Sequence, residues 1–523
     1  MNNRFRITDL LLLLAVPLFF FLWKLSSFGL VGADEPRYAQ AAREMLARHD
    51  WITPTLGGSP WLEKPPLYYW QAMFSYRLFS VSDWAARLPS AIDAFALVLA
   101  VYGFLRRFRP GLALDGALML ATAAGVIGYA RAASMDMALA ATFSIAMLAW
   151  YAWFESGSRR WLAIFYIFIA LAMLAKGPIA PFLALVMVAI FARTQRSMPL
   201  AWKTLWAPGI ALFSAVGLPW YILVQLRNPQ FFRVFILEHN LARFGTNIFH
   251  HPEPFWYYVP VISLGWAPWS IFVFGALILV LRRFRDKATD SLSAFLVIWI
   301  AVTVVFFSIS QSKLPGYVLP AIPPGIVLTA GYVRSRLTKR LGLVTAGLHA
   351  TLLVGLIFSA LMIQYIVLQH RVPWDSAVAA PLIVALLAAA AVMVILLNSG
   401  YKSLRLVTLA PAVVTLAVAL RFGAPVLDQT LSARSVVSAL SQFDPHPLPV
   451  AVFLVPRETE FGLHFYRNQV TPRYELGQVP NQEHLVVAAQ GYPEGVAKAA
   501  GRKAIYLGNF AAQKLDFFYV PAR

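Results

Sequence analysis

Long runs of apolar residues recur along most of the chain and are separated by short polar segments. Each run has close to the length, about 17–25 residues, that an α-helix needs to cross the hydrocarbon core of a membrane. The pattern predicts thirteen such helices, an odd number that places the chain ends on opposite sides of the membrane. They fall near residues 9–29, 88–105, 112–129, 136–154, 160–175, 179–193, 206–225, 258–281, 292–310, 317–334, 342–368, 378–398 and 405–425.

Basic residues collect in the short loops on one side of this predicted bundle. They precede the first predicted span and follow the second, fourth, sixth, eighth, tenth and twelfth, as Arg4, Arg106, Arg159, Arg193, Arg282, Arg334 and Lys402 illustrate. Cytoplasmic loops of membrane proteins carry such an excess. We therefore predict a cytoplasmic N-terminus, with the long loops 30–87 and 226–257 and everything after about residue 430 on the outside.

The first predicted span has features of a secretory signal peptide, because Val31-Gly32-Ala33 resembles a small-residue cleavage site. Its apolar stretch is longer than a usual signal core, and cleavage would leave Asp34 at a new N-terminus. We expect an uncleaved membrane anchor.

The pattern changes near residue 430. Short β-type runs at 450–455, 484–488, 504–507 and 517–520 alternate with helical stretches at 433–443, 458–468 and 493–502. This alternation predicts two parts, a membrane domain over residues 1–430 and a small α/β domain over 431–523 outside the membrane.

Composition agrees with a membrane protein and narrows its chemistry. Of the 523 residues, 59% are hydrophobic and 13% charged, whereas soluble domains average about 25% charged residues. The absence of cysteine excludes disulfides, thiolate metal sites and a cysteine nucleophile. The formal charge of +20 is explained by topology and anionic lipid, so we expect membrane lipids and no nucleic acid as partners.

The outer loop 30–87 is too long and too patterned for a simple connector. It begins Gly32-Ala33-Asp34-Glu35-Pro36-Arg37-Tyr38 and continues as an amphipathic stretch that predicts a juxtamembrane helix. Asp34 has two interpretations here, a helix N-cap with Pro36 in the first turn or a functional acid. Farther on, Glu63 and Lys64 stand directly before a Pro-Pro break and the aromatic run 67–70, in a rigid frame that surface charges do not need.

Other polar clusters fall on the same predicted side. Arg131 is interpreted as a snorkelling residue, whereas Asp136, an acid at the outer edge of a span, gains little from snorkelling. The remaining clusters are Lys176-Gly177-Pro178, Lys313-Leu314-Pro315-Gly316-Tyr317, and a long loop that contains His239, Arg243, His250 and His251. The histidines match no tight metal motif.

Nucleotide-binding motifs and a nucleophile elbow are absent from the sequence, so we expect no nucleotide cofactor. Any reaction would then use a donor supplied by the membrane. Lys64, Arg243, Lys313 and Arg37 are outer cations suited to a lipid phosphate, and a carboxylate could orient an acceptor.

These motifs resemble those of a known family. The stretches 34–38, 43–46, 63–70, 86–90, 254–258 and 313–320 are similar to the bacterial transferases that add 4-amino-4-deoxy-L-arabinose to lipid A. Those enzymes belong to the GT-C superfamily of polyprenyl-phosphate-sugar glycosyltransferases, which includes the protein O-mannosyltransferases. Protein O-mannosyltransferases usually carry a His-Pro-Pro pattern where this chain has Glu63-Lys64-Pro65-Pro66.

The resemblance implies roles for particular residues. Asp34 and Asp136 correspond to the catalytic acids, and the expected carrier-phosphate residues are Lys64, Arg243, Tyr317 and Lys313. Substrate contacts are expected from Glu35, Arg37, Tyr38 and Tyr68. The family can hold Zn²⁺ or another divalent cation, for which Glu63 and His239 are the candidate ligands.

The resemblance also implies a substrate pair and a location. We expect a monomeric enzyme of the bacterial inner membrane that transfers aminoarabinose from undecaprenyl phosphate to a lipid A phosphate. That lipopolysaccharide modification lowers attraction for cationic peptides such as polymyxin. Two alternatives stay open, a related enzyme with another sugar or acceptor (core oligosaccharide or a protein hydroxyl) and a non-enzymatic lipid flippase or transporter.

Overall fold

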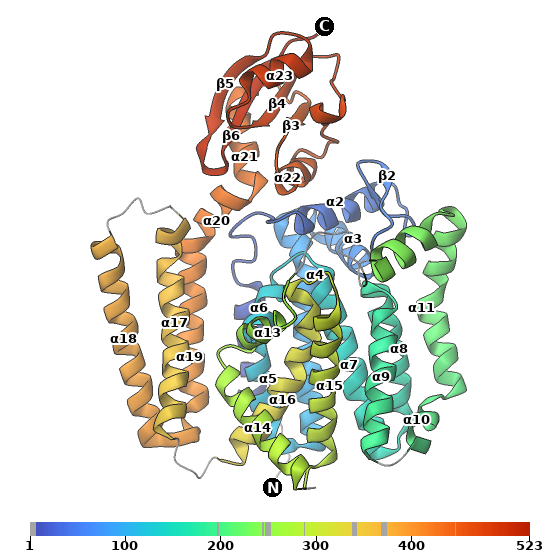
Figure 1. The fold of residues 1–523 in the computed structure, drawn as a ribbon, viewed down its shortest axis with the longest axis vertical. Coiled ribbons are helices and arrows are strands. Elements are labelled where there is room, and N and C mark those ends of the chain that lie inside the picture. The colour runs from blue at the N-terminus through green and yellow to red at the C-terminus, as the bar shows by residue number, and fades with distance from the viewer. Residues whose placement is uncertain are drawn as a thin grey trace.

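The computed structural model describes residues 7–195, 198–242, 245, 253–286, 288–336, 342–367, 374–444 and 446–523. A bundle of long helices carries a small α/β domain at one end (Figure 1). We call this end of the bundle the domain end and the opposite end the basic end.

Helices occupy every predicted span. Within the described residues, eight helices are long and apolar enough to cross a membrane, or up to ten if each of two bent pairs is one span. The chain is thus a multi-pass membrane protein, and the number thirteen stays a prediction. The helices of the bundle are α1 (Ile7–Pro17), α4 (Asp83–Phe108), α5 (Ala113–Ala121), α6 (Ala124–Ala130), α7 (Met135–Ser156), α8 (Arg159–Lys176), α9 (Ile179–Thr194), α10 (Met198–Thr204), α11 (Ala207–Arg227), α13 (Tyr258–Gly265), α14 (Ser270–Arg285), α15 (Ser291–Ile309), α16 (Ile322–Arg334), α17 (Leu343–Val367), α18 (Trp374–Ser399), α19 (Leu404–Val418) and α20 (Ala424–Leu431).

Two of the predicted spans, 112–129 and 258–281, are bent in the structure. The first is bent by 59° between α5 and α6, and the second by 114° between α13 and α14. Pro268 has no amide hydrogen and cannot continue a helix. A hydrogen bond joins the two breaks, because the Ala124 amide donates to the Ala267 carbonyl at 2.7 Å.

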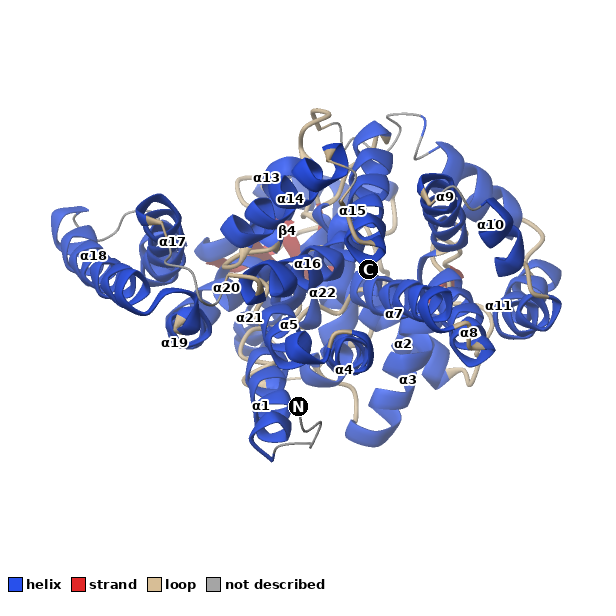
Figure 2. Ribbon diagram, turned by 90° about the horizontal axis from the view of Figure 1, so that it is seen from below, coloured by secondary structure: helices blue, strands red, loops and turns tan. Residues whose placement is uncertain are grey.

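Helix α7 lies in the centre of the bundle. Its apolar window is 83% buried inside the protein, against 17% for α18. Helices α17, α18 and α19 stand beside the other helices in both views (Figures 1 and 2). The central position of α7 matters because its first turn carries Asp136.

The first outer loop folds across the domain end (Figure 1). It contains α2 (Asp34–Ala47), the hairpin β1 (Thr55–Leu56) and β2 (Ser59–Pro60), and α3 (Leu67–Phe79). Glu44 of α2 ties down the hairpin by accepting bonds from the Thr55 hydroxyl at 2.7 Å and the Gly57 amide at 2.8 Å. Although burial opposes it, these and neighbouring hydrogen bonds hold the pKa of Glu44 below its usual value.

The C-terminal domain follows the predicted alternation. Strands β3 (Val450–Phe453), β4 (His484–Ala489), β6 (Leu515–Val520) and β5 (Ile505–Phe510) form one sheet in that order. The β3–β4 pair is parallel, as a crossover through α22 (Arg457–Arg467) requires, and the other pairs are antiparallel. Helices α21 (Ala433–Leu440) and α22 pack on one face of the sheet and α23 (Pro493–Ala500) on the other.

Arginines gather at the basic end, as the loop charges predict. Helix α4 starts at the domain end, where Asp83 pairs with Arg434, and its last turn carries Arg106 and Arg107. Helix α7 starts near Asp136 and ends where Glu155 pairs with Arg109. Short connections with cationic residues therefore lie on the side opposite the α/β domain.

Replacement of Glu44 by glutamine should lower stability in a pH-dependent way. A depressed carboxyl pKa contributes stability that is present above the unfolded value, about 4.3, and is lost as the pH falls through the folded value. We expect a deficit of about 1 kcal/mol at pH 7, after discounting for partial exposure, that shrinks below pH 4. Tryptophan-fluorescence melting in detergent measures it. Glu494→Gln, at an exposed position, is the control, and an equal deficit at pH 7 and pH 3.5 would contradict this role.

Candidate active site

A cavity of about 90 Å³ lies at the domain end of the bundle. Its polar side chains come from the first outer loop, from α8, from the helical segment Phe232–Ala242 and from the region around Tyr317. The lining residues are Glu63, Lys64, Leu139, Lys176, Ile179, Phe235, His239, Asn240, Phe306, Phe307, Ser310, Ser312 and Tyr317. Segments separated by more than 200 residues in sequence thus contribute ionisable groups to one cavity.

An ion pair between Asp136 and Lys176 stands beside this cavity. Asp136 belongs to the first turn of α7 and Lys176 is the last residue of α8, so each charge is at the helix end whose dipole favours it. The Ser134 hydroxyl donates to the second Asp136 oxygen at 2.8 Å. The Lys176 ammonium also lies 4.5 Å from the centre of the Tyr317 ring.

Glycine at position 316 permits this close packing. A Cβ atom there would lie 2.6 Å from the Asp136 carboxyl carbon, a distance that real Cβ atoms do not show. Tyr317 is therefore brought beside the acid and the lysine by the absence of a side chain at its neighbour. Its ring packs on Phe307 with 5.2 Å between centroids.

Asp34 is not an N-cap, so that interpretation is wrong. It is the first helical residue of α2, its carboxylate pairs with Arg37 one turn later, and its side chain is 54% exposed. The Arg37 side chain is only 13% exposed and lies within 5.7 Å of the ring centres of Tyr38, Trp61 and Phe461. Burial opposes the charge, but Tyr38, Asp34 and Glu63 together raise the pKa of Arg37 above its ordinary value.

The structure brings the two predicted acids to the same region. Asp34 and Asp136 both lie close enough to Tyr38 and Tyr129 to act on these phenols electrostatically. Lys64 acts in the same way on Asp136. Burial, with Asp34 next, raises the pKa of Tyr38, so its hydroxyl is neutral at physiological pH and serves as a hydrogen-bonding group.

Glu63 and His239 lie side by side, with 3.6 Å between Oε1 and Nε2. A catalytic zinc site takes three protein ligands and a structural site four. Among the residues that the structure describes, no group of three or more histidine, cysteine, aspartate or glutamate side chains is arranged to hold a metal ion. The pair therefore does not by itself fit the metal that the resemblance implies, and we route no reaction step through one.

Glu35, expected to contact substrate, is placed elsewhere. Its side chain is 8% exposed and pairs with Arg87, whose side chain is 0% exposed. The carboxylate also accepts bonds from the Val31 amide at 2.8 Å and the Ala133 amide at 2.7 Å. Both oxygens are thus used by the chain itself, so the prediction of a substrate contact at Glu35 is corrected to a structural role.

Two further predicted contacts have internal partners. The Tyr68 hydroxyl is fully buried and donates to the Ala86 carbonyl at 2.9 Å, which makes this tyrosine part of the α3–α4 packing. The Lys313 ammonium donates to the carbonyls of Glu253 at 2.9 Å and Ser310 at 2.7 Å and does not line the cavity.

The interpretation of Arg131 as a snorkelling residue is wrong, since its side chain is buried and donates to carbonyls at the end of the first span. Arg243, His250 and His251 lie outside the described residues.

Sequence reasoning did not choose Lys176 or Tyr129. Lys176 was visible as a cationic residue before a Gly-Pro break on the outer side, and that signal marked it as polar without indicating a partner. Tyr129 follows an apolar stretch and carries no local signal. Both contribute through the pairing of distant helices, which a local motif does not encode.

Residues 7–235 match the family profile of dolichyl-phosphate-mannose-protein mannosyltransferases. The chain is 32% identical over 318 residues to the undecaprenyl phosphate-alpha-4-amino-4-deoxy-L-arabinose arabinosyl transferase of Edwardsiella ictaluri, over 59% of this chain and 56% of that protein. It is also 32% identical over 342 residues to the transferase of the same name from Pseudomonas aeruginosa strain UCBPP-PA14, over 64% of this chain and 60% of that protein. In both cases the match spans less than two thirds of the relative's length.

The whole fold matches a solved structure. The crystal structure of ArnT from Cupriavidus metallidurans bound to undecaprenyl phosphate aligns with a TM-score of 0.78, at 22% identity, over 98% of this chain and 97% of that one. At this level of identity the match establishes a shared fold. Together with the sequence matches, this confirms the resemblance: the chain is related to the aminoarabinose transferases and, through its N-terminal part, to the protein mannosyltransferases.

Replacement of Arg87 by methionine should destabilise the protein strongly. The variant leaves the Glu35 carboxylate buried without its partner charge, at a cost of about 3–5 kcal/mol. Thermal unfolding of the full chain in detergent measures the loss. Arg109→Met removes a partly exposed ion pair with Glu155 and should cost less than about 1 kcal/mol. An Arg87→Met protein that melts with the wild type would contradict the structural role of Glu35.

Proposed function

We propose that this protein is an integral-membrane glycosyltransferase that moves 4-amino-4-deoxy-L-arabinose from undecaprenyl phosphate to a phosphate of lipid A. The observation that carries the proposal is the juxtaposition of Asp34, Asp136, Lys64 and Lys176 at one end of a membrane bundle. The names of the relatives supply the donor and the sugar, and the lipid A acceptor comes from the resemblance of the sequence motifs.

The proposed reaction is a displacement at the anomeric carbon. An oxygen of the acceptor phosphate forms the new bond to this carbon, and the bond to the undecaprenyl phosphate oxygen breaks with its electron pair. Negative charge grows on the departing phosphate. Lys64 and Lys176 line the cavity from two different elements, and their ammonium groups would stabilise that charge.

The carboxylates have a positioning role in this proposal. A phosphate acceptor is already an anion at neutral pH, so no base is needed to remove a proton. Asp34 is half exposed at the start of α2 and is available to orient the acceptor or the sugar. Asp136 holds Lys176 and Ser134 in place, which fixes the direction of the Lys176 ammonium.

The distribution of cationic residues supports an orientation of the chain in the membrane. The cationic ends of α4 and α14 lie away from the α/β domain, and positive residues favour the cytoplasmic side. We propose that the domain end faces the periplasm of a bacterial inner membrane and that the chain acts as a monomer.

Asp34→Asn should lower transfer by about a hundredfold or more while the protein remains folded, because the amide keeps the shape but loses the charge that orients a substrate. The assay follows aminoarabinose addition to lipid A by mass spectrometry, with purified protein and lipid-linked donor. Asp115→Asn breaks an ion pair with Arg405 at the basic end and should retain wild-type activity. Full activity of Asp34→Asn would contradict the assigned role.

Lys176→Met should lower kcat by about 10²–10³-fold, since one stabilising cation is lost at the departing phosphate.

The same assay, applied to the wild-type protein, separates the proposed function from the alternative functions. A different mass added to lipid A indicates another sugar, unchanged lipid A with a modified core or protein indicates another acceptor, and donor movement across vesicles without any product indicates a flippase.

A further inference from the structure

Phe461 connects the C-terminal domain with the candidate active site. Phe461 of α22 places its ring 5.7 Å from the Arg37 guanidinium carbon. Trp61, which follows the β1–β2 hairpin, and Tyr38 of α2 supply the other two rings, at 5.0 and 5.2 Å. We call Tyr38, Trp61 and Phe461 the Arg37 cage. Rings from two separately folded parts of the chain thus enclose the cation that pairs with Asp34.

Helix α22 is held firmly against the first outer loop. The Tyr466 hydroxyl donates to Asp83 at 2.6 Å and accepts from the Leu30 amide at 2.6 Å. Arg43 of α2 donates to the Phe465 carbonyl at 2.9 Å. These bonds are made by Phe465 and Tyr466, about one turn after Phe461 on the helix that contacts α2. The ring is therefore placed by the docking of a whole helix and does not depend on its own contact alone.

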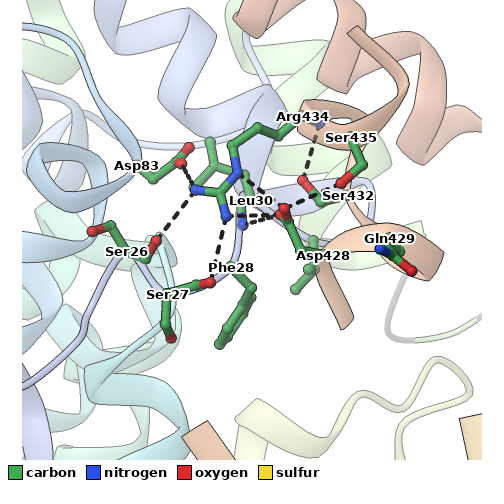
Figure 3. Close-up of polar contacts among 12 residues, drawn as sticks. Ser26, Ser27, Phe28, Leu30, Asp83, Asp428, Gln429, Ser432, Arg434 and Ser435 are labelled. Atoms are coloured by element: carbon green, nitrogen blue, oxygen red, sulfur yellow. Dashed lines mark hydrogen bonds and ion pairs between the residues drawn. The ribbon is translucent and has the colours of Figure 1, made fainter. Parts of the chain in front are cut away.

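A second network fixes the segment that leads into the domain. Arg434 pairs with Asp83 at 2.8 Å and with Asp428 at 2.9 Å, and it donates to the carbonyls of Ser26 and Ser27 (Figure 3). The Gly29 amide donates to Asp428 at 2.7 Å. A Cβ at position 29 would stand 2.5 Å from the Tyr466 hydroxyl, so only glycine permits this approach.

We propose that Phe461 is a positioning residue for Arg37 and, through Arg37, for Asp34. The proposal rests on the proposed function, because it assigns Asp34 an orienting role in transfer. An aromatic face attracts a guanidinium more strongly when water is excluded, and the Arg37 side chain is 13% exposed. Removal of the Phe461 ring would admit water and allow the Arg37 guanidinium to adopt more orientations. Asp34, which pairs with Arg37, would then hold its productive orientation for a smaller fraction of the time.

The shape of the side chain and its π-face can be separated by substitution. Phe461→Leu keeps an apolar side chain and removes the ring, whereas Phe461→Tyr keeps the ring. We expect Phe461→Leu to lower kcat for transfer about five- to tenfold with little change in KM for the lipid-linked donor, and Phe461→Tyr to restore most of the loss. Phe453→Leu is the matched control, since Phe453 packs on Tyr474 and Tyr492 inside the domain and should leave kcat unchanged.

A second measurement does not depend on sugar transfer. Hydrogen exchange of the full-length protein, followed by mass spectrometry, should show faster exchange in the first turns of α2 for Phe461→Leu and wild-type exchange for Phe461→Tyr and Phe453→Leu. Faster exchange together with a wild-type protein that transfers no sugar would overturn the proposed function and leave the positioning of Arg37 intact. Unchanged exchange and kcat in Phe461→Leu, or equal losses in the leucine and tyrosine variants, would overturn the positioning role.

Discussion

The buried ion pair between Glu35 and Arg87 is the constraint on which the site depends. Arg87 donates to Glu35 and to the carbonyls of Leu25, Phe28 and Gly29. Glu35 in turn accepts from the amide of Ala133, just before α7. One charged pair therefore joins the end of the first span, the start of α2 and the start of α7. Because Asp34 and Asp136 directly adjoin these joined segments, their separation is determined by a contact in which neither takes part.

The same constraint explains how so many charges coexist at the end of an apolar bundle. A charge removed from water is strongly unfavourable unless it is paired and hydrogen-bonded. Arg87, Arg37 and Lys176 are each buried or nearly so, and each has an acid within its own network. Only the first pair is fully enclosed. The Asp34 carboxylate is half exposed, and Lys176 lines the cavity, so these two groups are the ones that an entering ligand can reach.

The fold was predictable where a single period dominates the sequence. Apolar runs located the spans, and the alternation after residue 430 located the strands and helices of the α/β domain, including α22 and α23. The bends at α5–α6 and α13–α14 were not predictable from hydropathy, because a broken and a straight span can have the same mean hydropathy. Pro268 was a sequence signal for the second bend, but it does not give the direction or size of the bend. Hydropathy indicates which segments are buried in lipid, but it does not indicate hydrogen bonds between the breaks of two different helices.

The site was predictable in its location and only in part in its members. The motifs around Asp34 and Glu63 drew attention to Glu35 and Tyr68 as well, yet their side chains point into the packing and their oxygens are occupied by the chain. Adjacent residues on a helix point about 100° apart, so a motif identifies a segment whereas packing decides which of its side chains faces the cavity. Lys176 shows the converse case: its role depends on the antiparallel contact of α7 and α8, which places the C-terminus of one helix beside the N-terminus of the other.

The C-terminal domain extends this argument from residues to domains. Most of its buried side chains pack against its own sheet, which makes it a body with its own core. Its contact with the first outer loop and the start of α4 combines apolar packing, in which Phe465 shares a buried cluster with Tyr38 and Met45, with specific hydrogen bonds and the ring of Phe461. Hydrogen bonds and a cation–aromatic contact are directional, so they fix orientation more closely than apolar packing of equal area would. An interface of this composition suits a domain whose placement relative to α2 matters for the charges that α2 carries.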